Sequence, residues 1–436
     1  MVIHFFYVLY RYLLLYDNNN FNNNITIMSL FIKLFNTTAE YNAYTADTAN
    51  FIKPNVSCAM DDLTNMHYNP IPPETRVVAK YNVTDTSSST QLCYSGAVNQ
   101  FSAIEIDGVA QSNVVSEYEF GTVGEHTVKY TLTDPTSIGV SAFTQCTSLT
   151  SIVMPNSVTG IGSHAFYKCS GFTSIDIPDS VTIIGSSAFS SCYSLTSCTI
   201  GSGVTSIDDY AFYYCDSLTS IDIPDSVTSI GKSVFSFCKS LMSIDMPDSV
   251  TSIGSYVFQR CSGLTSCTIG SGVTSIGSYA FSSCTSLTSC TIGSGVTTIG
   301  MGAFTSCNSL TSIGIPDSVR RIDSNAFEFC RSLTSIDIPD SVTIIGSSAF
   351  SSCTGLTSCT IGSGVTSIGS YAFYNCSRLA SIVSNAVTAP TIKNNTLQGI
   401  KTNGTLRVPS GSSGYDVWMG TGDYYLGLYN WTKVEQ

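Results

Sequence analysis

Residues 279–301 read YAFSSCTSLTSCTIGSGVTTIGM, and this 23-residue unit decides the fold. The unit recurs in one unbroken register. A Phe returns every 23 residues from Phe143 to Phe373, and a Cys follows each Phe three positions later, from Cys146 to Cys376. These steps define eleven repeats. An internal period of this length is typical of a solenoid, in which each unit buries its apolar side against its neighbours.

The repeat has the general form A-F-x-x-C-x-x-L-x-x-I-x-I-P-x-x-V-x-x-I-G. Its L-x-x-I-x-I part places apolar residues as a short strand needs, for example at Leu149, Ile152 and Met154, and a Pro or Gly then turns the chain. V-x-x-I predicts a second extended piece, as at Val158 and Ile161. The segment around A-F-x-x-C is too short for more than one helical turn or a 3₁₀ piece. Stacked rungs predict a parallel β-sheet roughly 50 Å long.

This pattern resembles the BspA-like leucine-rich repeats, the 23-residue variant with the signature L-x-x-I-x-I-P…V-x-x-I-G-x-x-A-F-x-x-C, over residues 136–384. The resemblance implies a β-rich leucine-rich-repeat solenoid, with a parallel sheet and short helical turns. It also implies a bacterial, protist or phage protein that binds other proteins or cell surfaces, and it implies no catalytic residues.

The chain has 17 Cys, and most of them follow the repeat. Cys198, Cys267, Cys290 and Cys359 share a slot with Ile in other repeats, so they behave as small apolar residues. In the main column, rungs about 4.8 Å apart fall within disulfide reach, but in-register side chains point in parallel and an odd number leaves one over. We therefore expect buried free thiols, with some disulfides as the alternative. Zinc is disfavoured because no CxxC or Cys/His cluster is present.

Composition argues against several classes of function. A net charge of −12 disfavours nucleic acid and anionic membranes as partners. Four His and no visible nucleophile–base set leave little material for catalysis, so we expect no enzyme, no cofactor and no small-molecule substrate. An exposed strand column carries a mild Asp/Thr ladder, as at Asp222 and Thr268. We expect no metal there, because the G-G-x-G-x-D repeat of calcium rolls is absent.

The flanking segments differ from the repeats. Arg11 interrupts the apolar run of residues 1–27 and no A-x-A site follows, so we interpret this segment as a mistranslated leader, with an atypical anchor as the alternative. We interpret residues 28–73 as an N-terminal arm and linker. Residues 74–134 alternate as strands do and contain an Asp107-Gly108 turn signal, which predicts a small β-sandwich domain. The period fails after 384, and we interpret residues 385–436 as a C-terminal cap.

Candidate binding residues lie where the repeats differ from one another. In repeats two to six, the positions around A-F-x-x-C hold aromatic and basic residues that other repeats replace by Ser or Thr. Tyr and Arg are frequent interface anchors, although such residues are also tolerated on a plain surface. The candidates in the repeats are Tyr167, Tyr193, Tyr210, Tyr213, Tyr214, Phe237, Tyr256 and Arg260.

The C-terminal segment supplies two further candidates. Besides the cap, Tyr415, Trp418, Tyr424, Tyr425 and Trp431 allow an aromatic carbohydrate platform, so Trp418 and Trp431 complete the set of candidate binding residues. We expect a non-enzymatic recognition or adhesion protein that binds a cell-surface protein or glycan and is located extracellularly, on a cell surface or in a virion, without a clear signal peptide. The alternative is a structural spacer or fibre component of a phage virion or bacterial surface layer. The ligand and the oligomeric state stay open.

Overall fold

The computed structural model describes residues 56–58, 68–70, 76–422 and 425–436, and it divides into two units, Met1–Pro73 and Glu74–Gln436. In the first unit, β1 (Val56–Cys58) pairs antiparallel with β2 (Tyr68–Pro70). The leader or anchor expected over 1–27 lies outside the described residues. The arm and linker expected over 28–73 are described only in these two strands.

The second unit starts with antiparallel strands. One sheet has the order β10-β3-β8-β5-β6, and β4 pairs with β7. The Asp107-Gly108 turn joins β5 to β6 with positive φ at both residues, so this predicted hairpin is confirmed. A separate sandwich domain over 74–134 stays a prediction. The elements are β3 (Val77–Val83), β4 (Thr90–Gln91), the 3₁₀ helix η1 (Ser95–Gln100), β5 (Phe101–Ile106), β6 (Val109–Ala110), β7 (Glu117–Tyr118) and β8 (Gly124–Leu132).

The antiparallel sheet that contains β3, β8, β5 and β6 continues into the repeats through β10, the strand that follows the Phe143 turn. β3 pairs antiparallel with β10, and the rings of Phe101 and Tyr130 lie 5.5 and 5.3 Å from the ring of Phe143. The N-terminal end of the stack is therefore covered by backbone pairing and aromatic packing. An uncovered end would expose the apolar ladders of the solenoid.

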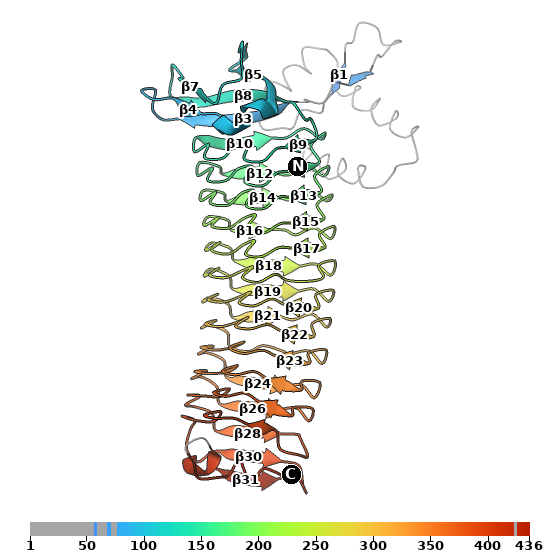
Figure 1. Cartoon of the computed structure of the whole chain (residues 1–436), viewed down its shortest axis with the longest axis vertical. Coiled ribbons are helices and arrows are strands. Elements are labelled where there is room, and N and C mark those ends of the chain that lie inside the picture. Colours follow the sequence, from blue (N-terminus) through green and yellow to red (C-terminus); the bar gives the residue numbers. More distant parts are fainter. Residues whose placement is uncertain (1–55, 59–67, 71–75, 423–424) are drawn as a thin grey trace, which may run out of the picture. The chain divides into compact units, whose positions relative to one another are not determined.

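The repeats form two columns of short parallel strands. In Figure 1 the two columns lie side by side, and the strands of each column lie one above the other. The first column comprises β10 (Leu149–Val153), β12 (Ser174–Asp176), β14 (Ser197–Thr199), β16 (Ser220–Ile221), β18 (Ser243–Met246), β19 (Ser266–Ile269), β21 (Ser289–Thr291), β24 (Ser335–Ile338), β26 (Ser358–Ile361) and β28 (Ser381–Ser384). The second comprises β9 (Ser137–Ile138), β11 (Gly160–Ile161), β13 (Ile183–Ile184), β15 (Ser206–Ile207), β17 (Ser229–Ile230), β20 (Ser275–Ile276), β22 (Thr298–Ile299), β23 (Arg321–Ile322), β25 (Ile344–Ile345) and β27 (Ser367–Ile368).

Parallel pairing keeps each repeat position in register with the same position of the next repeat. Ser174 pairs with Ser197, which pairs with Ser220, so partners are one sequence period apart. Thr side chains reinforce the stack: Thr196 Oγ1 donates to the carbonyl oxygen of Thr173, 3.0 Å away, one repeat earlier. The parallel β-solenoid that the 23-residue period predicts is confirmed.

The core consists of columns of identical side chains. All eleven repeat Phe rings are fully buried, and consecutive rings stack with centroids 5.0 to 5.6 Å apart. The eleven column Cys are buried as free thiols, as are Cys93, Cys198, Cys267, Cys290 and Cys359. From Cys169 to Cys376, each thiol donates to the Phe carbonyl oxygen of the preceding repeat, for example Cys261 Sγ to Phe235 O at 3.0 Å. The expectation of buried free thiols is confirmed.

The A-F-x-x-C segment is a series of turns and not a continuous helix. In the second repeat, Tyr167 N–H donates to His164 O and Cys169 N–H to Phe166 O, which are hydrogen bonds of the 3₁₀ type. The intervening N–H groups donate instead to the next repeat, for example Phe166 N to Ala188 O at 2.7 Å. Residues two before and two after the Phe have positive φ in every repeat, and this breaks the helical path.

The stack continues past the boundary expected at residue 384. β28 pairs in parallel with β30, and β30 with β31. Ser381 faces Thr405 and Thr405 faces Thr432, so the spacing changes while the rungs persist. The elements are β29 (Thr391–Ile392), β30 (Thr405–Val408), the 3₁₀ helix η2 (Leu426–Tyr429) and β31 (Thr432–Glu435). Among the described residues, no helix has the length and apolarity needed to cross a bilayer.

Candidate binding surface

The turns of repeats three to six bring most of the predicted residues together. We define the aromatic–basic patch as Tyr193, Tyr210, Tyr213, Tyr214, Lys232, Phe237, Lys239, Tyr256 and Arg260. All of these side chains are partly or fully exposed, and Tyr193 is 44% exposed. Tyr167 lies outside the patch, because its ring contacts are with His164 and Lys168.

Backbone geometry places four patch aromatics in unusual positions. Tyr210, Tyr214, Phe237 and Tyr256 all occupy the positive-φ positions on either side of the buried Phe. Positive φ is unfavourable for bulky residues, and Gly or Asn would adopt it more easily. In other repeats Ser is the commonest residue at these positions, with Asn or Gly at some of them. The positive φ therefore does not explain the aromatic residues at these four positions, and aromatic residues also occur at equivalent positions outside the patch, at Tyr279, Phe329 and Tyr371.

The aromatic rings of the patch contact one another across three repeats. Tyr213 meets Tyr210 at 5.5 Å and Tyr214 at 4.6 Å, both edge to face. Tyr214 then stacks on Phe237 of the next repeat, with centroids 4.2 Å apart and planes 15° apart. Tyr193 completes the group from the preceding repeat, 6.5 Å from Tyr214. Aromatic pairs in these geometries attract beyond their area of burial, so the rings hold one another in place.

Three cations lie against these rings. Arg260 lies 5.2 Å from the centroid of Phe237, and Lys239 lies 5.9 Å from that of Tyr214. Lys232 lies between Tyr210 and Tyr256, at 5.8 and 5.6 Å. Such cation–π contacts are attractive. Sequence reasoning did not place Lys232 in the site, although it stands out in a column that is otherwise mostly Ser.

Two pKa shifts follow from this packing. The hydrogen bond that Lys239 Nζ donates to Asp216 Oδ2, at 2.9 Å, raises the pKa of Lys239. Burial, followed by the neighbouring Tyr214 and Tyr210, raises the pKa of Tyr213. Lys239 therefore stays a cation and Tyr213 a neutral hydrogen-bonding group around neutral pH.

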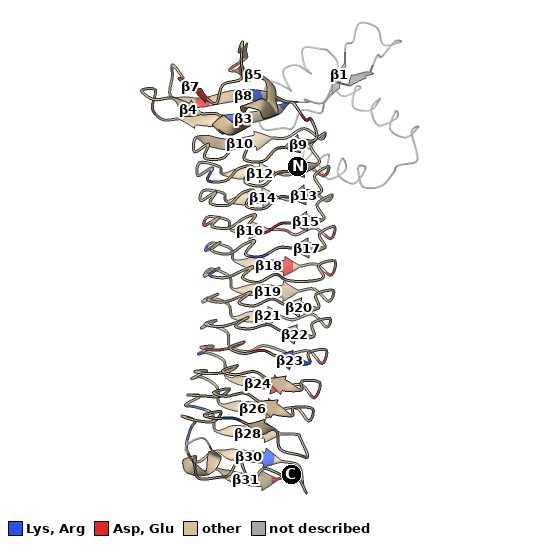
Figure 2. Cartoon of the chain, in the orientation of Figure 1, with Lys and Arg blue, Asp and Glu red and all other residues tan. Residues whose placement is uncertain are grey.

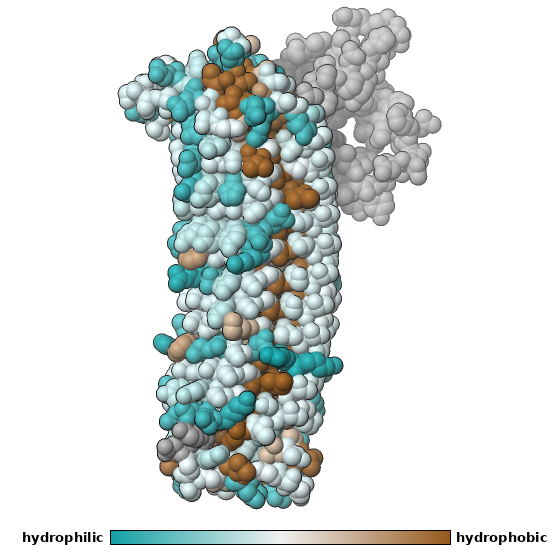
Figure 3. Space-filling model, viewed as in Figure 1, coloured by the Kyte–Doolittle hydropathy of each residue, from teal (hydrophilic) through white to brown (hydrophobic). Residues whose placement is uncertain are grey.

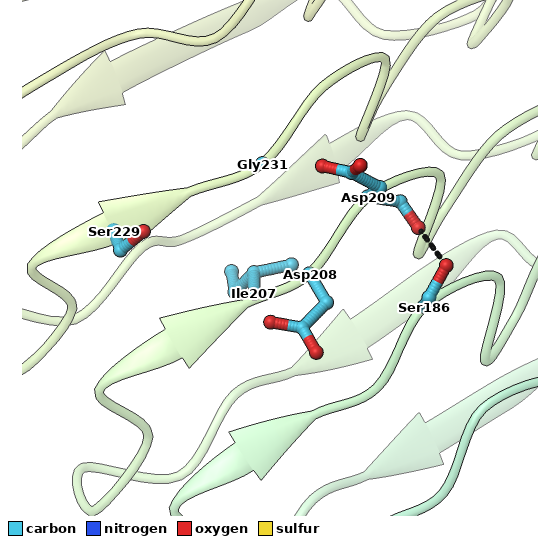
Figure 4. A pocket seen from close by; sticks show the side chains of 6 residues that line it. All are labelled: Ser186, Ile207, Asp208, Asp209, Ser229 and Gly231. Carbon is cyan, nitrogen blue, oxygen red and sulfur yellow. Dashed lines mark hydrogen bonds between the residues drawn. The ribbon is translucent and has the colours of Figure 1, made fainter.

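A shallow depression of about 350 Å³ adjoins the patch (Figure 4). It is lined by Ser186, Ile207, Asp208, Asp209, Ser229 and Gly231. Its carboxylates are already engaged: Asp208 Oδ1 accepts from Ser206 Oγ at 2.9 Å, and Asp209 Oδ1 accepts from Lys232 N–H at 2.6 Å. Within the part of the chain that the structure describes, no group of three His, Cys, Asp or Glu side chains could hold a metal ion. The depression is therefore a feature of the surface beside the patch.

The predicted carbohydrate platform at the C-terminus is wrong. Tyr415 and Trp418 are 1% exposed and Trp431 is 5% exposed, so their faces are not open to a sugar. Trp418 Nε1 donates to Pro390 O at 3.0 Å, and Trp431 Nε1 donates to Lys401 O. These rings pack against the last rungs, as large side chains with one polar group do in a core. Tyr425 is partly exposed, and Tyr424 lies outside the described residues.

The fold and the repeat columns together define a class: a leucine-rich-repeat protein built as a parallel β-solenoid. The chain belongs to the BspA-type leucine-rich repeat family, whose model matches residues 136–265, 205–332 and 297–412. The comparison with curated proteins found no match.

Three solved structures illustrate the likeness. A Treponema pallidum leucine-rich repeat protein is 34% identical and covers 35% of this chain and 72% of its own, with a TM-score of 0.34. A leucine-rich cell surface protein from Faecalibacterium prausnitzii is 32% identical and covers 59% and 84%, with a TM-score of 0.34. A leucine-rich repeat protein from Bacteroides ovatus is 27% identical and covers 70% and 88%, with a TM-score of 0.34.

Proposed function

We propose that this protein is a non-enzymatic recognition protein that binds a protein on a cell surface through the aromatic–basic patch. The observation that carries the proposal is the patch itself. Six rings and three cations are linked by ring–ring and cation–ring contacts across neighbouring repeats, on turns where most other repeats have Ser or Thr. Clustered Tyr and Arg side chains are enriched at the energetic centres of protein interfaces.

The rest of the solenoid supports this assignment by contrast. On the face drawn in Figure 3 much of the surface is neither strongly apolar nor strongly hydrophilic, and one narrow apolar stripe and several hydrophilic groups lie along the stack. The core columns fix the backbone of each turn, so side chains on the turns vary without cost to the core. A rigid scaffold with variable turns is a common basis for binding. We place the partner on a cell surface and the protein outside the cell or in a virion.

The test is binding of the labelled full-length chain to intact bacteria, with and without protease treatment of the cells. The decisive variant combines Tyr213→Ser, Tyr214→Ser and Phe237→Ser. Ser already occupies these columns in other repeats, for example at Ser282 and Ser283, so the fold should accept it. We expect saturable, protease-sensitive binding that falls at least about tenfold in the variant, since interface anchors typically contribute more than about 1.4 kcal/mol together.

The matched control is the double variant Tyr371→Ser, Tyr374→Ser in the last repeat. These tyrosines are 41% and 37% exposed and occupy the same columns as two of the patch tyrosines. The control should bind like the parent chain. Equal binding by all three proteins would refute the role of the patch, and protease-resistant binding would point to a glycan. Complete absence of binding would favour the structural spacer.

A further inference from the structure

We infer that the aromatic–basic patch binds an acidic segment of its protein partner, with carboxylates meeting Arg260 and Lys239. This inference rests on the proposed function and adds the chemistry of the partner. It depends on which groups of the patch remain available once the contacts within the patch are made.

The faces of the central rings are already covered. Tyr214, Phe237 and Arg260 occupy the same column in three consecutive repeats. Phe237 therefore has Tyr214 stacked on one side, at 4.2 Å, and Arg260 on the other, at 5.2 Å. A sugar ring or an aromatic side chain of a partner has no open face of Phe237 to stack on. The groups that remain are ring edges, Tyr hydroxyls and the N–H donors of the cations.

The cations at this side of the patch are oriented and exposed. Arg260 is exposed and has no ion pair among the described residues. Lys239 is half exposed, and its one ion pair, with Asp216, holds it beside Tyr214. These two cations lie on neighbouring rungs, and each can donate N–H hydrogen bonds to a carboxylate of an extended acidic segment. Because the rings restrain both side chains, less conformational entropy is lost when they bind.

The distribution of charge around the solenoid favours the same partner. The Pro-Asp-Ser turns on the opposite edge carry acidic side chains, whereas Lys and Arg gather on the turns that include the patch (Figure 2). The acidic turn residues are Asp179, Asp225, Asp248, Asp317 and Asp340. On a chain with a net charge of −12, the patch brings together three cations, with Asp216 paired to Lys239 and Asp209 beside Lys232. Asp208 and Asp209 line the depression on the Tyr210 side, so the acidic segment is expected on the Arg260 side.

The experiment measures fluorescence anisotropy of three labelled peptides of equal length with the full-length chain: alternating Glu and Ser, alternating Gln and Ser, and alternating Lys and Ser. We expect the Glu peptide to bind most tightly and to weaken as salt is raised, because exposed charge pairs are screened. Arg260→Glu and Lys239→Glu should each weaken it by about tenfold. Arg378→Glu makes the same charge change at an exposed residue outside the patch, and it should leave binding within about twofold of the parent.

Each other outcome contradicts the inference. Equal binding of the Glu and Gln peptides, or no measurable binding of the Glu peptide, would overturn it, and so would an equal loss in the Arg378→Glu control. The same variants in the cell-binding assay separate this inference from the proposed function. Loss of cell binding on Tyr213→Ser, Tyr214→Ser, Phe237→Ser with full binding by Arg260→Glu would reject the acidic segment and keep the patch. Full cell binding by both the triple Ser variant and Arg260→Glu would reject the proposed function.

Discussion

Alkaline pH should unfold the solenoid through its column of thiols. Burial raises the pKa of every column thiol above the ordinary value of 9.0, to about 12 for Cys330 and Cys376. The folded-state pKa lies above the unfolded value, so below pH 9 both states keep the proton and the column contributes its full stability. As the pH rises from about 9 towards about 12, only the unfolded chain releases protons, and the free energy of unfolding falls.

The size of the effect follows from the number of thiols. Between about pH 8 and about pH 10, each buried thiol that ionises only in the unfolded state lowers the free energy of unfolding by about 1.4 kcal/mol. Eleven such thiols together correspond to a loss on the order of 15 kcal/mol, which equals or exceeds the total stability of an ordinary domain. We therefore expect the repeats to unfold by about pH 10, well below the pKa of the buried thiols.

The assay is urea unfolding of the full-length chain with a thiol reductant, followed by circular dichroism at several pH values from neutral to alkaline. Cys215→Ala and Cys261→Ala provide the control. Each replaces a fully buried thiol and should reduce the loss of stability between about pH 8 and about pH 10 by about 1.4 kcal/mol, whatever its cost at neutral pH. A free energy of unfolding that stays constant over this range, or the same pH dependence in the Ala variants, would refute the reasoning.

Three further predictions concern packing. Gly272→Ala should destabilise the chain by about 3 kcal/mol in urea unfolding, because the added Cβ would lie 1.9 Å from the carbonyl oxygen of Asp248. The control is Gly314→Ala, whose Cβ would meet nothing within 4 Å and which should cost less than about 1 kcal/mol. Similar costs for the two variants would contradict this packing. Trp418→Ala should cost about 3–5 kcal/mol by the same measurement, since it removes a buried ring and the bond to Pro390 O, and a neutral result would restore a surface role for this ring. A thiol-specific dye at pH 8 should label almost none of the eleven column cysteines in the native chain and all of them in urea. Rapid native labelling of these residues would show that the thiols are accessible.

The repeats were predictable because each residue meets the same environment in every rung. A 23-residue period and an invariant Phe–Cys spacing are enough to predict that each repeat position stacks on the same position of the next repeat. The pairing of Ser174 with Ser197 and of Ser197 with Ser220 confirms this register. The two last rungs were missed for the same reason. The chain between Thr405 and Thr432 is longer than one period, so backbone pairing persists where the sequence signal ends.

The candidate site was predictable only in part. Tyr214, Phe237 and Arg260 are one period apart, so stacking of the rungs makes them neighbours, and they are in contact. Nothing in the sequence distinguishes an exposed Trp from a buried one in a segment without a period, so both a cap and a surface platform stayed open for Trp418 and Trp431, and they lie inside. Burial depends on contacts with distant segments, which spacing alone does not report.

The sequence by itself determined the solenoid, because local repetition dictates which columns must be apolar and a single rung cannot bury them alone. It also determined that Cys sits in the core, since Cys198 and its equivalents alternate with Ile. Only the tertiary structure decided which ring faces stay open, which cations lie against them and how the end of the stack is closed. Those features depend on side-chain directions between neighbouring rungs, and a turn with positive φ changes these directions without leaving any mark in the period.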